Sequence, residues 1–110
     1  MGINEFEKGK KFSFNESISY AEKAVVSKHV LKNEAGNISL FAFDKGEGLS
    51  EHTAPFDAVV FIVDGQAEII IGGHSNMLDA GETIVMPANI SHALKAIEPF
   101  KMVLTMIKSQ

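Results

Sequence analysis

Two of the four histidines in this chain of 110 residues stand where an imidazole can do chemistry. His52 ends the stretch GEGLSEH just before an apolar run, and His92 opens the alternating stretch HALKAI. An imidazole changes charge near neutral pH, so it can transfer protons, bind a divalent metal or hydrogen-bond an organic ligand. The two side chains are therefore the first candidates for a functional site, provided that the fold brings them together.

Alternating apolar and polar residues predict that strands position these histidines. The expected strands are rich in β-branched and aromatic residues and lie at 24–32, 38–44, 57–64, 67–72, 83–87, 91–97 and 100–108. Turn signals, among them Asp64-Gly65, separate them at intervals of about 8–12 residues, as in a β-sandwich or barrel. Only residues 15–23 have the composition of a short helix, without a clear apolar face. We expect an all-β domain.

Composition excludes several classes of function. The chain has no cysteine, so disulfides, thiolate metal sites and cysteine nucleophiles are ruled out. All ten basic residues are lysines and the net charge is −4, which indicates no nucleic-acid partner. No apolar run is long enough to span a membrane or to form a secretory signal. We therefore expect no membrane association and a cytoplasmic protein.

Glycine, proline and histidine recur at the spacing of two known motifs. The positions that match are Gly46, His52 and Gly65, followed by Gly81, Pro87 and His92. Together they resemble the two motifs of the cupin family, over residues 38–108. The resemblance implies a cupin-type jelly-roll β-barrel in a single domain. We assign the barrel to residues 36–110, and residues 1–35 to N-terminal strands that pack on the barrel or on a dimer interface.

The resemblance also implies a metal site, which this sequence carries only in part. In the family, two histidines and a glutamate of the first motif and one histidine of the second bind a divalent metal. Here His52 and His92 match, whereas Ala54 and Ala58 replace the other two ligands. A methyl group donates no lone pair, and catalytic zinc or iron usually has three protein ligands. We expect a weakened or absent site for Fe, Ni, Zn or Mn.

The first functional hypothesis is a binding protein that holds a small organic ligand near His52 and His92. Ala58 and Val60 share one face of their strand, and with Ala54 they predict a small-residue floor beside an apolar wall. We place Met86 in the same pocket, as a flexible apolar side chain.

The second hypothesis is a divalent-metal-dependent oxygenase or isomerase. Asp57 lies one position before the glutamate slot, so on a regular strand its side chain points to the opposite face. A bulge beside Pro55 would turn it inward and complete a facial triad with His52 and His92. Metal-free proton transfer by a histidine is the third hypothesis. The sequence indicates no substrate.

Two strands are apolar on both faces, at AVVFIV and EIII. A strand buried on both sides needs a second layer of structure or a partner chain. Because the chain is short, a second subunit can supply that layer. We expect a homodimer.

Overall fold

The computed structural model describes residues 6–108, and all of their regular structure is β. The strands are β1 (Val25–Asn33), β2 (Gly36–Phe43), β3 (Gly48–His52), β4 (Phe56–Ile71), β5 (His74–Asp79), β6 (Thr83–Met86) and β7 (His92–Lys108). The described residues form no helix, at 15–23 or elsewhere, and so contain no helix able to cross a bilayer. The expected all-β class is confirmed.

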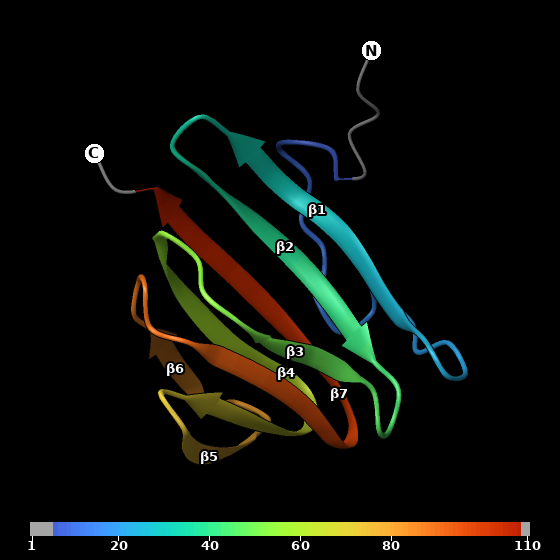
Figure 1. The fold of residues 1–110 in the computed structure, drawn as a ribbon. Helices are drawn as coiled ribbons and strands as arrows, with labels where there is room; N and C mark the ends of the chain where they lie inside the picture. The colour runs from blue at the N-terminus through green and yellow to red at the C-terminus, as the bar shows by residue number, and fades with distance from the viewer. Residues whose placement is uncertain (1–5, 109–110) are drawn as a thin grey trace.

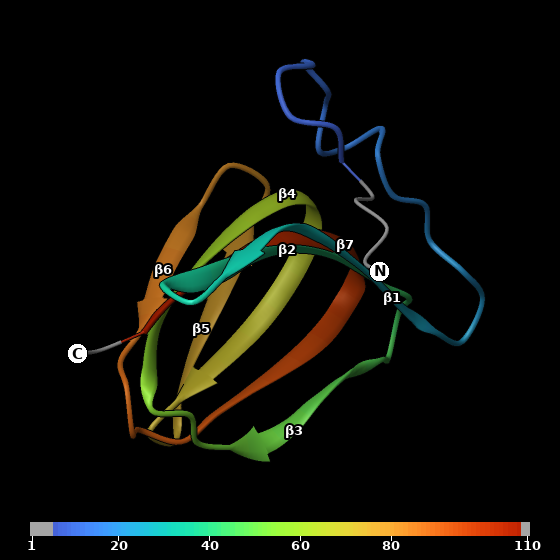
Figure 2. The ribbon, with the colours of Figure 1, turned by 90° about the horizontal axis from the view of Figure 1, so that it is seen from above.

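The seven strands form one antiparallel sheet in the order β1-β2-β7-β4-β5, with β3 paired to β7 and β6 paired to β4 (Figure 1). Seen from above, the strands curl around a common interior, and β3 lies across that interior from β2 (Figure 2). This curling brings β3 and the first part of β7 together at one side of the barrel, where the two motif histidines lie.

Four of the expected strands merge into two long ones. β4 has 16 residues and β7 has 17, so the turn predicted at Asp64-Gly65 is wrong. The β4–β7 register shifts on both sides of Gly65 instead, which marks a bulge. Gly65 has φ 84°, and a Cβ there would lie 1.8 Å from the carbonyl oxygen of Pro99. Glycine therefore bends β4 closely against β7 without ending it.

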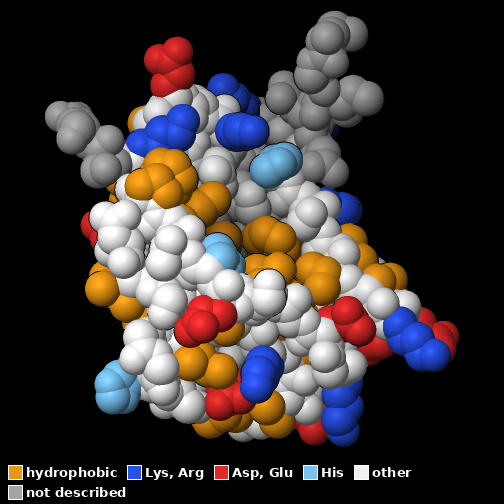
Figure 3. Space-filling view, in the orientation of Figure 1, with side chains coloured by type: hydrophobic (Ala, Val, Ile, Leu, Met, Phe, Trp, Pro, Cys, Tyr) orange, Lys and Arg blue, Asp and Glu red, His pale blue; other side chains and the backbone are white. Residues whose placement is uncertain are grey.

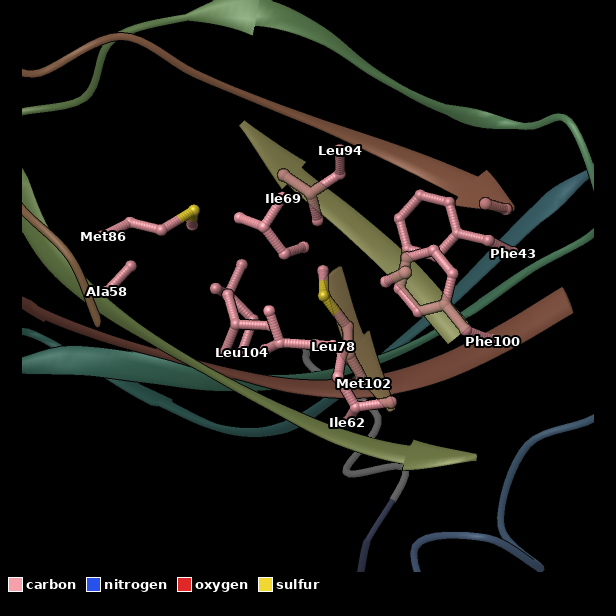
Figure 4. Packing of buried hydrophobic residues seen from close by; sticks show 13 residues of the cluster. Phe43, Ala58, Ile62, Ile69, Leu78, Met86, Leu94, Phe100, Met102 and Leu104 are labelled. Atoms are coloured by element: carbon pink, nitrogen blue, oxygen red, sulfur yellow. The ribbon is translucent and has the colours of Figure 1, made fainter. Parts of the chain in front are cut away.

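Side chains of alternate residues fill the barrel interior. Phe43 and Phe100 stack with ring centroids 4.4 Å apart and planes 9° from parallel. This aromatic pair lies at one end of the packed interior, and Ala58 and Met86 lie at the other (Figure 4). The aromatic end is fully packed, so any internal space must lie near Ala58 and Met86.

Residues 6–24 form an arm without strands that packs on the outside of the barrel. Thus, in the part of residues 1–35 that the structure describes, β1 is the one strand. Ile18 is only 3% exposed, in a cluster with Leu40 and Val103. This second cluster covers one outer face of the sheet, so the second layer expected from the doubly apolar strands comes in part from the chain itself.

Polar contacts fix the arm to the barrel. The Lys101 ammonium donates hydrogen bonds to the backbone and side-chain oxygens of Asn15, at 2.6 and 3.0 Å. It also lies 5.2 Å from the centroid of the Tyr20 ring, and the Tyr20 hydroxyl donates to Asp64. Burial, helped by the hydrogen bond and negative charge of Asp64, raises the pKa of Tyr20.

Candidate functional site

The structure brings the two motif histidines into contact. β3 ends at His52, β7 begins at His92, and the two residues face each other in the β3–β7 pairing. Their ring centroids are 4.3 Å apart, and the two Nε2 atoms are 3.1 Å apart. An irregularity between Leu49 and His52 accompanies this pairing. Residues forty positions apart in the chain thus form one constellation.

Backbone carbonyls fix the outer nitrogen of each ring. The Nδ1–H of His52 donates to the carbonyl oxygen of Ser50 at 2.7 Å, and that of His92 donates to Ile90 at 3.3 Å. A carbonyl only accepts, so these contacts favour the tautomer with hydrogen on Nδ1 in both rings. In a neutral imidazole this leaves a lone pair on Nε2. The two nitrogens that face each other are therefore both acceptors when the rings are neutral.

The two imidazoles differ in exposure. His92 is 7% exposed, whereas His52 lies at the surface. Burial lowers the pKa of His92, and the nearby His52 lowers it further, against the opposing effect of the Ile90 carbonyl. Burial thus favours the neutral form of the His92 ring. The pair combines a neutral acceptor inside the barrel with a second imidazole at the mouth.

A cavity of about 60 Å³ opens beside the pair. Apart from the two histidines its lining is apolar, and it consists of Leu49, Ala54, Phe56, Ala58, Met86, Leu94, Met102, Leu104 and Met106. Three residues of the expected pocket, Ala54, Ala58 and Met86, line it. Val60 is fully buried in the core and does not contribute to the lining.

Several lining residues were not predicted as site residues. Met102, Leu104 and Met106 alternate along β7, which indicates that they share a face. Alternation does not distinguish a filled interior from a cavity wall, so the sequence alone could not assign these residues to the pocket. The surface view shows hydrophobic side chains gathered beside a histidine in the middle of one face, with charged groups farther out (Figure 3).

Asp57 does not lie with the histidines. Its side chain is exposed, outside the cavity lining, and its Oδ1 accepts a hydrogen bond from the backbone N–H of Ala88 at 2.9 Å. This contact fixes the turn before β7, where Asn89 has φ 64° and donates its N–H to the Ala54 carbonyl. Asp57 therefore braces the loop that leads to His92.

The donor set does not fit a resident metal ion. Within residues 6–108 no group of three or more histidine, cysteine or acidic side chains is placed to hold one. The site itself offers two imidazole nitrogens, fewer than the three protein ligands usual in catalytic sites. The remaining histidines lie elsewhere: His29 on β1 contacts Ser39, and His74 is the exposed first residue of β5.

Comparison with known proteins identifies the fold. Residues 39–108 match the family model of the cupin domain. A conserved protein of unknown function from Streptococcus pyogenes is 35% identical, with a TM-score of 0.92, over 98% of this chain and 95% of that one. A cupin 2 conserved barrel domain protein from Leptotrichia buccalis is 37% identical, with a TM-score of 0.85, over 88% of this chain and 47% of that one.

A curated relative extends the comparison at the sequence level. An uncharacterized protein of Streptomyces coelicolor is 29% identical over 62 residues, which are 56% of this chain and 59% of that protein. The chain thus matches little more than half the length of this relative. With the structural matches, these findings confirm the expected jelly-roll barrel.

Proposed function

The chain belongs to the cupin domain family, and on that premise we propose that it binds a small organic molecule at the mouth of its barrel. One observation carries the proposal: two Nε2 atoms converge to 3.1 Å beside a cavity whose remaining walls are apolar. Such a combination of an apolar body and a few convergent polar groups is typical of ligand pockets. The imidazoles orient the polar end of the ligand, and the walls bury its apolar end.

The size of the cavity limits the ligand. At about 60 Å³, it is well below the roughly 150 Å³ of an apolar cavity that holds benzene. A chain of a few carbon atoms fits without rearrangement. Met86, Met102 and Met106 line the space, and their unbranched side chains can shift to admit a somewhat larger body.

Amide NMR of metal-free protein, titrated with a panel of small neutral organic molecules, tests the proposal. We expect saturable shifts centred on Ala54, Ala58 and His92. Ala58→Leu fills the cavity and should abolish them, whereas Val59→Leu, on the other face of β4, should not. Shifts that persist in Ala58→Leu, or that never saturate, would contradict binding inside the barrel.

A metal-dependent oxygenase or isomerase is the alternative. The convergence of two imidazoles favours it, but a third ligand is missing because Asp57 binds Ala88. Metal-free proton transfer is disfavoured too, since each Nδ1 meets a backbone carbonyl in place of a carboxylate. We expect substoichiometric metal in the untagged wild type and about one ion per chain in Ala54→His/Ala58→Glu. Stoichiometric, tightly held metal in the wild type would overturn this ranking.

The homodimer stays a prediction. Leu31 and Ile107 are exposed hydrophobic residues beside a shallow groove at the ends of β1 and β7. A second subunit covering such residues would be stabilised by burial of their apolar surface. Light scattering coupled to size-exclusion chromatography should give twice the mass of one chain. One chain has a mass of 11.9 kDa. A mass equal to one chain would show that the exposed residues need no partner.

A further inference from the structure

We propose that the ligand offers two adjacent hydrogen-bond donors to the histidine pair, as a vicinal diol does, on a short apolar tail. This inference rests on the proposed function and specifies the ligand class of the same pocket. It follows from the direction of the hydrogen bonds around the two rings, the surroundings of the two Nε2 atoms and the order of polar and apolar groups from mouth to floor.

Both rings turn an acceptor toward the ligand space. Since Ser50 and Ile90 accept from the Nδ1 atoms, neither Nε2 carries a hydrogen in the neutral state. Within residues 6–108, the one polar contact of either Nε2 is the other Nε2, at 3.1 Å. Two facing lone pairs repel each other, and a buried acceptor without a donor is costly. A ligand that donates to both removes these costs together.

The same geometry discriminates between ligand classes. A carboxylate or an ether brings only acceptors to the pair, so it adds further lone-pair repulsion. A vicinal diol has two O–H groups on neighbouring carbons, and each can donate to one Nε2. The backbone N–H of Asn89 is not available to donate to either Nε2, because it already donates to the carbonyl oxygen of Ala54.

Position in the pocket decides which end carries the donors. His52 is exposed at the mouth, whereas Leu94 and Met102 are buried deeper in the lining. The hydroxyl groups should therefore stay at the mouth while the hydrocarbon tail enters the apolar space. The small volume restricts the tail to a few carbon atoms unless the methionines move.

A pair of isomeric molecules tests the inference. Pentane-1,2-diol and 1,2-dimethoxypropane have the same formula, and only the first has donors. Titrations of EDTA-treated protein, followed by amide NMR, should show the diol binding about tenfold more tightly, as expected for two net hydrogen bonds. Pentanoate, an anion of similar size, should bind more weakly than the diol.

Variants locate the preference. His52→Ala removes one acceptor at an exposed position and should reduce the diol preference to about threefold or less. His74→Ala removes an exposed histidine outside the pocket and should leave the preference unchanged.

The outcomes separate this inference from the proposed function. Equal saturable binding of the diol and the diether would overturn the inference and leave small-molecule binding intact. A preference for pentanoate would overturn it as well, since it would show that the pair presents a hydrogen or a positive charge. Failure of every compound to shift the pocket amides would contradict the proposed function and the inference alike.

Discussion

Two of the polar side chains that the barrel buries, Lys101 and His92, find their hydrogen-bond partners in different ways. On the outer face, Lys101 is 9% exposed and donates twice to Asn15 beside the Tyr20 ring. At the mouth, His92 is 7% exposed, and its Nε2 faces only another imidazole nitrogen. The two side chains are buried to a similar extent. Lys101 donates to oxygen acceptors, whereas the Nε2 acceptor of His92 faces a second acceptor.

This difference distinguishes a structural polar group from one that is available to the proposed ligand. A buried polar group whose partners all come from the chain contributes to stability, because the fold itself compensates its desolvation. A group aimed at another acceptor gains nothing comparable from the fold. Such a group would be stabilised by the proposed ligand, so its removal should affect ligand binding much more than the stability of the fold.

Gly65→Ala should have the largest effect on the free energy of unfolding, because it should disturb both the arm side around Lys101 and the mouth around His92. The added Cβ would lie 1.8 Å from the Pro99 carbonyl oxygen, and the residue has φ 84°, which disfavours any side chain. Because the bend in β4 holds β7 on both sides of Pro99, we expect a loss of about 3 kcal/mol or more in unfolding free energy. Urea denaturation measures it. Gly73→Ala, with φ 81° but open space around its Cβ, is the control that isolates the clash.

Lys101→Ala should damage the arm side alone. It removes two hydrogen bonds to Asn15 and the packing of a buried stem, at a cost of about 2 kcal/mol. Denaturant midpoints measure the loss, and binding in the pocket should persist in the folded protein. Lys95→Ala, at an exposed position of the same strand, should stay within about 0.5 kcal/mol of the wild type. An equal loss in both variants would contradict a specific role for Lys101.

His92→Leu should have the opposite effect to Lys101→Ala: it should impair binding and leave stability nearly unchanged. Leucine extends the apolar lining and removes one of the facing acceptors, so stability should stay within about 1 kcal/mol of the wild type or increase. Binding of a hydroxylated ligand should be lost. Parallel denaturation and titration measure both effects. A large loss of stability would show that His92 is structural, like Lys101.

Tyr20→Phe should have the smallest effect, about 1 kcal/mol at neutral pH, since it removes one hydrogen bond to Asp64. The folded state raises the pKa of Tyr20 above its usual value of 10.0, so the hydroxyl contributes fully below that pH. Above it, the unfolded chain ionises first and the contribution declines. The stability difference between wild type and Tyr20→Phe should therefore shrink as pH rises above 10.0, as measured by urea denaturation. A constant difference would contradict the raised pKa.

The sequence predicted the barrel because the glycines and the proline of the two motifs stand where the backbone of a strand or turn requires these residue types. Most strand positions followed from alternation, and His52 and His92 followed from motif spacing. Asp64-Gly65 was misread as a turn, since the same dipeptide serves a hairpin or a bulge and only the approach of Pro99 decides between them.

Other features depend on contacts that no local pattern records. The arm at residues 6–24 has no period, so its packing on β2 and β7 could not be expected from alternation. The direction of each imidazole depends on the carbonyls of Ser50 and Ile90, which every residue possesses. The placement of Asp57 likewise depends on the backbone of Ala88. Residue types indicated the candidates, and backbone geometry determined their roles.

The protonation of the four imidazole nitrogens at the mouth tests the account most directly. Nitrogen-15 NMR of histidine-labelled, metal-free protein, at a pH where both rings are neutral, distinguishes a ring nitrogen that carries hydrogen from one that does not. We predict that both Nδ1 atoms carry hydrogen, that both Nε2 atoms do not, and that pentane-1,2-diol shifts both Nε2 signals. Hydrogen on the Nε2 of His52 or His92 in the free protein would contradict a pair of converging acceptors.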